Sequence, residues 1–356
     1  MPNVPHHGRG ATANPQGRFE RLAADPFDDG WGSLETRAAE PPPSTEIRPD
    51  RAKRAITYNQ SPDIGFDRSI NPYQGCEHGC IYCYARPSHA FHGLSAGIDF
   101  ETKIFAKHDA ASLLRQELAL PGYRPRSIAL GANTDPYQPI ERRLLITRRV
   151  IETLVEVRHP FGITTKSAGV LRDLDLLAEA ARLQILRVDI SLTTLEPELA
   201  RRMEPRASAP HRRLEAIRRL AAMGIPVGVN LAPIIPGLND HEIEALLEAA
   251  AAAGAWTASS ILVRLPFEVK DLFLAWLQEH YPLRAERIVS LIRQCRDGRL
   301  NDPAFGSRMA GSGPVAALID QRFRQARRRL GLEQKLPPPR TDLFRPPARD
   351  GQLSLF

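Results

Sequence analysis

The stretch "YQGCEHGCIYCYAR", residues 73–86, gathers three cysteines into eight positions of a 356-residue chain. Cys76, Cys80 and Cys83 follow the spacing C-x3-C-x2-C, and the sequence holds one further cysteine, Cys295. In a reducing compartment, clustered thiols are more often metal ligands or catalysts than disulfide partners. The spacing therefore predicts a metal centre on this stretch.

The number of thiols distinguishes two kinds of metal centre. A closed structural zinc site uses four ligands, and only His78 or His89 lies nearby in the sequence to complete one. Three thiolates instead suit a [4Fe–4S] cluster that keeps one iron open for a small molecule. Gly75 and Gly79 allow the backbone to approach such a cluster closely. We predict the iron–sulfur cluster, with zinc as the alternative.

Downstream of the cysteines, β-branched runs alternate with amphipathic segments that end at glycine. This pattern predicts strands at 127–133, 161–167, 185–194, 226–235 and 259–265, and helices at 142–157, 170–183, 211–224, 241–254 and 269–280. "DRSINPY", just before the cysteines, supplies a further strand end. Repeated strand–helix units imply a parallel sheet. We predict an α/β fold, a partial (β/α)6 TIM-type barrel with flexible N- and C-terminal tails and polar strand ends at one edge.

Composition divides the chain into four parts. Residues 1–50 are rich in Pro, Gly and charge, which predicts a flexible arm or one draped over the domain. Residues 51–283 form the predicted barrel with the cluster site, and 284–334 a basic, mostly helical extension. Residues 335–356 are proline-rich, which predicts a tail without regular structure.

Charge is uneven along a chain whose formal net charge is +7. Residues 284–340 carry thirteen Lys or Arg and five Asp or Glu, a net charge of +8. Such a segment either lies along a phosphate backbone or forms a solvated helix face, and the sequence does not choose between them. The sequence shows neither an apolar span of membrane length nor an export signal, so we expect a cytoplasmic protein with no membrane contact.

The cysteine spacing, with an aromatic residue before the last cysteine, resembles the radical S-adenosylmethionine superfamily over about residues 65–280. The resemblance implies a [4Fe–4S] cluster whose open iron chelates S-adenosyl-L-methionine. It also implies an electron donor such as flavodoxin or ferredoxin, and reductive cleavage of the cofactor to methionine and a 5′-deoxyadenosyl radical. The cofactors would carry the chemistry while the protein positions them.

A narrower resemblance links the chain to the spore photoproduct lyase and DNA-repair-photolyase-like group. The shared features are "YCY" at the last cysteine, "TK" at a strand end, a serine in "ISLTT", and "AP" at residues 232–233. This resemblance implies that DNA is the substrate. It places five residues around S-adenosylmethionine: Tyr82, Thr134, Asp135, Lys166 and Ser191.

The same resemblance assigns Tyr84 a role in returning hydrogen to the product, but one part of the pattern is missing. The lyases carry a hydrogen-donating cysteine just ahead of the pair that aligns with Thr134–Asp135, and here that stretch reads Ala132–Asn133. The remaining thiol, Cys295, is expected to be a semi-buried helical cysteine. Either Tyr84 acts alone or the substrate differs.

The chain ends in "QLSLF", which resembles the pentapeptide by which bacterial replication and repair proteins bind the DNA sliding clamp. Gln352 offers an amide for hydrogen bonds, and Leu355 and Phe356 are apolar anchors. Clamp binding would agree with a role on DNA. Two alternatives remain at this stage: the same chemistry on an RNA, protein or small molecule, and a non-enzymatic metal-stabilised module that binds DNA or the clamp.

Overall fold

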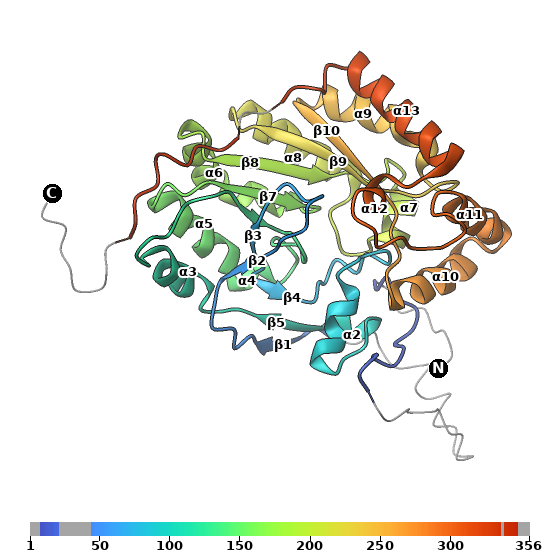
Figure 1. Cartoon of the computed structure of the whole chain (residues 1–356), viewed down its shortest axis with the longest axis horizontal. Helices are drawn as coiled ribbons and strands as arrows, with labels where there is room; N and C mark the ends of the chain where they lie inside the picture. Colours follow the sequence, from blue (N-terminus) through green and yellow to red (C-terminus); the bar gives the residue numbers. More distant parts are fainter. Residues whose placement is uncertain (1–7, 21–43, 336–337, 348–356) are drawn as a thin grey trace, which may run out of the picture.

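The computed structural model describes residues 8–20, 44–335 and 338–347. In this part of the chain a seven-stranded sheet has the order β10-β9-β8-β7-β6-β3-β2 (Figure 1). Strand β2 (Ile56–Tyr58) is antiparallel to its neighbour. The other strands are parallel to one another: β3 (Arg68–Ile70), β6 (Ile128–Leu130), β7 (Phe161–Thr165), β8 (Leu186–Ser191), β9 (Val227–Ile234) and β10 (Thr257–Leu262).

The predicted α/β class and partial barrel of six parallel strands are confirmed. Within the described ranges β2 and β10 are the two edges of the sheet and do not pair with each other, so the barrel is open. Because the strands are parallel, all of their carboxyl ends lie at one edge. That edge receives the loop with the three cysteines, which follows β3.

Amphipathic helices cover the sheet because their apolar stripes are withdrawn from water against it. In α5 (Ile146–Glu156), Ile146, Val150 and Leu154 are spaced four residues apart and are fully buried. Before the C-terminal segment, the other long helices are α3 (Ala110–Leu118), α6 (Leu174–Arg182), α8 (Pro210–Ala222), α9 (Ile243–Ala252) and α10 (Glu268–His280). None of the helices among the described residues is both long and apolar enough to cross a membrane.

The single helix predicted at 142–157 is wrong: the structure has α4 (Glu141–Leu144) and then α5. Leu145 between them adopts a left-handed backbone, with φ of 52°. The Glu141 carboxylate accepts hydrogen bonds from the backbone N–H groups of Thr147 at 3.0 Å and Arg148 at 3.3 Å. A carboxylate that satisfies the free N–H groups of a first turn begins a new helix, which periodicity alone does not show.

A smaller sheet, not predicted from the sequence, has the order β1-β5-β4. It consists of β1 (Glu46–Pro49), β5 (Lys103–Ala106) and β4 (Tyr73–Gln74). Strand β1 belongs to the predicted flexible arm, as do residues 8–20, in which Ala11 and Thr12 are buried. For these two segments the contacts are those of the draped arrangement, one of the two that the sequence left open.

The segment that contains α11, α12 and α13, residues 282–329, packs on the same side of the barrel as β10. Helix α11 (Pro282–Gln294) contacts α10, and α13 (Gly313–Arg329) contacts α9, with α12 (Ser307–Ala310) beside β10 (Figure 1). Residues 338–347 also lie on the domain, since the backbone N–H groups of Arg340 and Arg345 donate to carbonyl oxygens of Gln184 and Val157. This part of the predicted flexible tail is therefore ordered.

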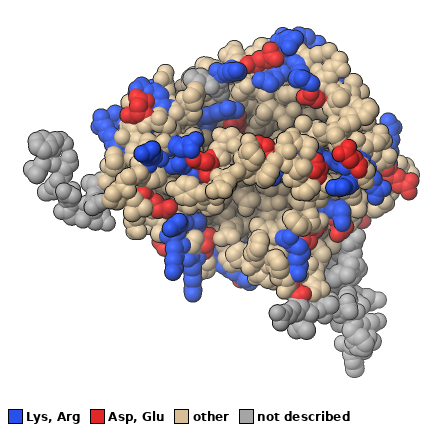
Figure 2. All heavy atoms as spheres, viewed as in Figure 1, with Lys and Arg blue, Asp and Glu red and all other residues tan. Residues whose placement is uncertain are grey.

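Most arginines of α13 form ion pairs within the protein. Arg322 and Arg329 contact Glu244 and Glu248 of α9, each at 2.6 Å, and Figure 2 shows Lys and Arg interspersed with Asp and Glu over this view of the surface. Of the two interpretations left open by the sequence, these contacts favour a solvated, internally paired helix face.

The remaining short helices are α2 (Ile98–Thr102), α7 (Pro197–Met203), η1 (Arg86–His92), η2 (Ala168–Asp173) and η3 (Asp240–Glu242).

Candidate active site

The loop between β4 and η1 carries all three of the clustered cysteines. Cys76 and Cys80 are buried and Cys83 is partly buried. Two tight turns shape the loop, because the N–H groups of Gly79 and Cys83 donate to the carbonyls of Cys76 and Cys80 at 3.3 and 3.2 Å. Gly79 has a φ of 67°, a conformation that favours glycine. The two turns therefore fold the short segment that carries the three cysteines back on itself.

The surroundings of the thiols favour their protonated form when no metal is bound. Burial raises the pKa of the Cys76 thiol, and the nearby Cys80 and Cys83 raise it further. Burial also raises the pKa of Cys80 to about 12, with a contribution from Glu204. Thiols in such a site become thiolates when metal binding displaces their protons. Three thiols, two of them buried and one partly buried, fit a [4Fe–4S] cluster with one open iron.

The loop between β4 and η1, which carries the three cysteines and is called the cluster loop below, is anchored to the loop after β6. Two residues that the sequence analysis missed, Glu77 and Gln138, form this anchor. The Gln138 amide accepts a hydrogen bond from the Glu77 N–H at 2.9 Å and donates to the Gly75 carbonyl at 3.2 Å. The Glu77 carboxylate accepts from the Ile140 N–H at 2.6 Å. Gln138 lies in the polar strand end "GANTDPYQPIE", the one sequence signal that pointed toward it.

Four of the predicted cofactor residues lie at the carboxyl ends of β6, β7 and β8, which are neighbours in the sheet. Thr134 and Asp135 follow β6, Lys166 follows β7, and Ser191 ends β8. Thr134 donates to the Tyr73 carbonyl at 2.6 Å and so joins the loop after β6 to the start of the cluster loop. The fold thus places these residues along one edge with the cysteines.

Asp135 is a hub of hydrogen bonds. Its carboxylate accepts from the Thr165 hydroxyl and the Lys166 N–H, each at 2.7 Å, and lies 3.4 Å from Nδ1 of His78. Burial acts to raise the pKa of Asp135, but His78 and these donors outweigh it and lower the pKa to about 2. The carboxylate is therefore ionised at neutral pH and holds the ends of β6 and β7 together.

Tyr82 and Lys166 lie beside a buried ion pair that the sequence analysis did not identify. The Arg213 guanidinium contacts the Glu204 carboxylate, and that carboxylate accepts a hydrogen bond from the Tyr82 hydroxyl. The Lys166 ammonium lies 5.8 Å from the centre of the Tyr82 ring. Burial acts to lower the pKa of Lys166, but Cys80 and Glu204 outweigh this and raise it. The ammonium therefore stays charged.

Tyr84 lies at the accessible side of the site. Its side chain is 47% exposed, and its hydroxyl donates to the carbonyl of Ala132. The Arg264 guanidinium, two residues beyond β10, lies 5.2 Å from the centre of the Tyr84 ring. Tyr84 thus contacts the stretch in which the lyase-like cysteine is missing.

The fourth cysteine and the two candidate zinc histidines have other environments. Cys295 directly follows α11 as its C-cap residue and is fully buried in the apolar core, rather than semi-buried as predicted. His78 faces Asp135, and Nε2 of His89 lies 2.9 Å from the carbonyl of Lys103. These contacts give no support to the zinc alternative.

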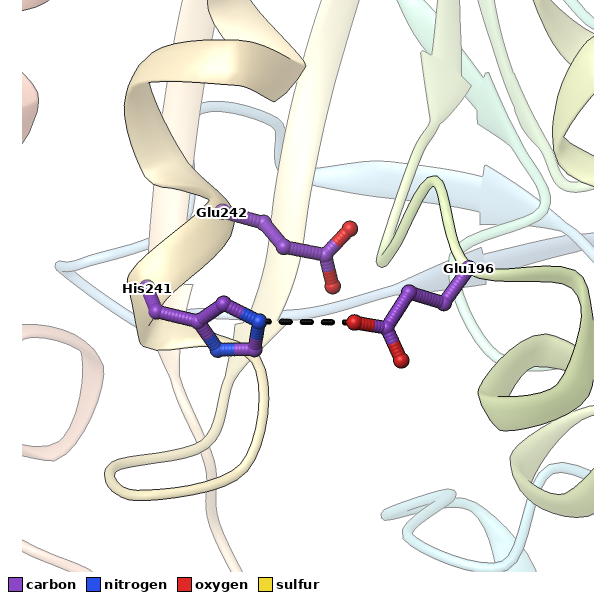
Figure 3. A group of neighbouring side chains, drawn as sticks. All are labelled: Glu196, His241 and Glu242. Carbon is purple, nitrogen blue, oxygen red and sulfur yellow. Dashed lines mark ion pairs between the residues drawn. The ribbon is translucent and has the colours of Figure 1, made fainter.

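A second group of possible metal ligands consists of Glu196, His241 and Glu242 (Figure 3). Nε2 of His241 lies 3.5 Å from the Glu196 carboxylate, and both side chains are exposed. The buried Glu242 already accepts hydrogen bonds from the Thr194 hydroxyl at 2.5 Å and the Leu195 N–H at 2.7 Å. We therefore interpret the group as an exposed ion pair beside a structural carboxylate.

The fold and the three-cysteine loop together define a class of enzyme. The family model for the Radical SAM superfamily matches residues 70–250, about half of the chain. The chain belongs to this superfamily, whose members use a [4Fe–4S] cluster and S-adenosylmethionine as cofactors. It is therefore an enzyme with these two cofactors.

The chain is also similar to individual relatives and to solved structures. An uncharacterized protein of Mycobacterium tuberculosis is 34% identical over 295 residues, which cover 82% of this chain and 83% of that protein. An uncharacterized protein of Methanocaldococcus jannaschii is 28% identical over 197 residues, 55% of this chain and 71% of that protein. Spore photoproduct lyase complexed with dinucleoside spore photoproduct has a TM-score of 0.56 at 16% identity and covers 80% of this chain and 78% of that one. The last comparison shows a shared fold.

Proposed function

We propose that Cys76, Cys80 and Cys83 hold the [4Fe–4S] cluster and that the enzyme acts on DNA. When bound, the cluster and S-adenosylmethionine supply reductive cleavage of the cofactor to methionine and a 5′-deoxyadenosyl radical, which abstracts hydrogen from the substrate. The observation that carries the proposal is the position of three free cysteines on one loop at the carboxyl edge of an open parallel sheet. This is the edge at which such folds bind their ligands.

The residues beside the cluster loop have distinct proposed roles. The Lys166 ammonium is charged and pairs with the carboxylate of S-adenosylmethionine. Tyr82 and Ser191 line the same binding site, with Tyr82 oriented by Glu204. Asp135 and Thr134 hold the strand ends at the correct spacing, since their side chains are already hydrogen-bonded within the protein.

Two observations support DNA as the substrate. The structural neighbours include a variant of spore photoproduct lyase with bound AdoMet and dinucleoside spore photoproduct, and its TM-score is 0.55. Arg264, a cation without an ion pair among residues 8–20, 44–335 and 338–347, lies over the exposed ring of Tyr84. An aromatic ring with an unpaired arginine suits a base and its phosphate. In this proposal Tyr84, which contacts Ala132, returns hydrogen without the donor cysteine that the lyases carry in the stretch aligned with Ala132–Asn133.

The test is anaerobic reconstitution with iron and sulfide, followed by low-temperature EPR before and after addition of S-adenosylmethionine. We expect a reduced [4Fe–4S] signal that changes on addition, and 5′-deoxyadenosine formation that increases with DNA. Cys83→Ala should lose most of the cluster, while the matched Cys295→Ala should keep it, because Cys295 lies in the apolar core. Turnover that responds to RNA, a protein or a small molecule and not to DNA would replace the substrate assignment.

The proposed partners are an electron donor, such as flavodoxin or ferredoxin, and the bacterial sliding clamp, in the cytoplasm. The clamp motif, with Gln352, Leu355 and Phe356, lies outside the described residues, so this part rests on sequence. Deletion of residues 352–356 should abolish binding to purified clamp while leaving the cluster spectrum unchanged. Equal clamp binding by the deleted and full chains would exclude the motif.

A further inference from the structure

A buried ion pair connects the N-terminal segment, residues 9–18, to the cluster loop. Glu101, in α2, has no exposed surface, and its carboxylate accepts hydrogen bonds from the N–H groups of Gly10 at 2.9 Å and Ala11 at 2.8 Å. The same carboxylate contacts the Arg86 guanidinium at 2.5 Å. Because an ionised carboxylate forms strong bonds with N–H donors, residues 10 and 11 are fixed to this pair.

The other side of the ion pair reaches the cysteines. Arg86, also fully buried, donates to the carbonyl oxygens of Gly79 at 3.0 Å and Cys80 at 2.9 Å. Ala11 belongs to the same buried apolar cluster as Cys80 and Ile81. A single network therefore joins the backbone of residues 10–11 to the backbone that carries one of the cluster ligands.

Two glycines permit this contact between backbones. A Cβ atom on Gly10 would lie 1.8 Å from the carbonyl oxygen of Gly79, in the cluster loop. A Cβ atom on Gly97 would lie 2.1 Å from the carbonyl oxygen of Ala13. Real Cβ atoms do not approach backbone so closely, so either change to alanine must displace the segment.

The remaining contacts of the segment fix its position along the domain. Asn14 and Asp99 form two reciprocal hydrogen bonds, at 3.1 and 3.0 Å. Arg18 forms an ion pair with Glu268 of α10 at 2.7 Å. Figure 1 shows the segment in dark blue, running beside α2 and below α10. A segment with no regular secondary structure is thus anchored at several separate points.

We infer that residues 9–18 form a clasp that holds the cluster loop in its metal-binding conformation, with Arg86 and Glu101 as positioning residues. The inference rests on the proposed role of Cys76, Cys80 and Cys83 as cluster ligands. The physical reason is that Arg86 fixes two carbonyls of the loop, and the clasp fixes Arg86 through Glu101. Outer contacts of this kind typically change metal affinity about 10–100-fold.

The test compares iron release from reconstituted wild-type, Gly10→Ala, Gly97→Ala and Gly65→Ala proteins mixed without oxygen with an iron(II) chelator. We expect Gly10→Ala and Gly97→Ala to release iron at least about tenfold faster than wild type. Gly65→Ala is the matched control, because its Cβ would meet nothing within 4 Å. Hydrogen exchange on the iron-free proteins should show faster exchange in residues 75–83 of the first two variants only.

Iron release at the wild-type rate from both Gly10→Ala and Gly97→Ala would overturn the inference if exchange shows the segment displaced. If the segment adapts to alanine, a variant lacking residues 1–20 decides, because unchanged release from it also overturns the clasp. If that variant does not fold, Asn14→Ala removes only the bonds to Asp99, and its release rate decides in the same way. Failure of wild type to hold iron would instead contradict the proposed function.

Discussion

Lys166 shows how the proposed role of a single residue at a strand end depends on its neighbours. Cys80 and Glu204, the latter already bonded to Arg213 and Tyr82, raise the pKa of Lys166 and keep its partly buried ammonium charged. Lys166→Ala should weaken S-adenosylmethionine binding about 10- to 100-fold, the worth of one charge-assisted hydrogen bond of about 1.5–3 kcal/mol. Equilibrium binding to the reconstituted protein measures this, and its iron content should remain that of wild type. Equal loss of iron and binding would show that Lys166 is structural.

The corner where β7 follows α5 carries a pH-sensitive element. His159 is fully buried, with Nδ1 donating to the Pro160 carbonyl and Nε2 accepting from the Tyr123 hydroxyl, each at 2.9 Å. Phe344, in the tail segment 338–347, packs edge-on against the His159 ring, with 5.3 Å between the two ring centres. Burial lowers the pKa of His159 to about 4, so the ring is neutral in the folded state.

The consequence is a loss of stability in acid. The unfolded chain binds a proton at His159 with a pKa of about 6.5, whereas the folded protein resists it until about pH 4. The unfolding free energy contributed by this group is therefore complete above pH 6.5 and falls by about 2–4 kcal/mol as the pH drops to 4. Chemical denaturation at both pH values should show a smaller fall for His159→Gln than for His108→Gln, an exposed control. Identical falls would contradict the assignment.

At the scale of the whole molecule, net positive charge is a poor guide to where DNA would bind. Arg322 is bonded to the Glu244 carboxylate at 2.9 and 2.6 Å, whereas Arg264 at the site has no ion pair in the described part of the chain. Arg264→Ala should weaken binding of a single-stranded oligonucleotide about tenfold, and Arg322→Ala less than about twofold. Fluorescence anisotropy at fixed salt distinguishes them, and a larger loss for Arg322→Ala would move the DNA surface to α13.

The sequence by itself determined the features that depend on neighbouring positions in the chain. The three cysteines, with glycines that allow tight turns, lie within one loop, so their spacing alone already indicated the superfamily and its cluster. The parallel strands and their covering helices follow from short apolar periods, and the partial barrel was predicted from these. Polar strand ends at Thr134, Lys166 and Ser191 follow from the same topology, because parallel strands end at one edge.

Only the tertiary structure decided which distant groups pair in the interior. Glu204 and Arg213 look like surface residues in the sequence, yet they form a buried ion pair under Tyr82. The segment 9–18 looks like part of a flexible arm because it has no apolar period, and it is held by hydrogen bonds to a carboxylate some 90 residues away. Local patterns record which face of an element is buried, whereas contacts made once between distant residues leave no period to detect.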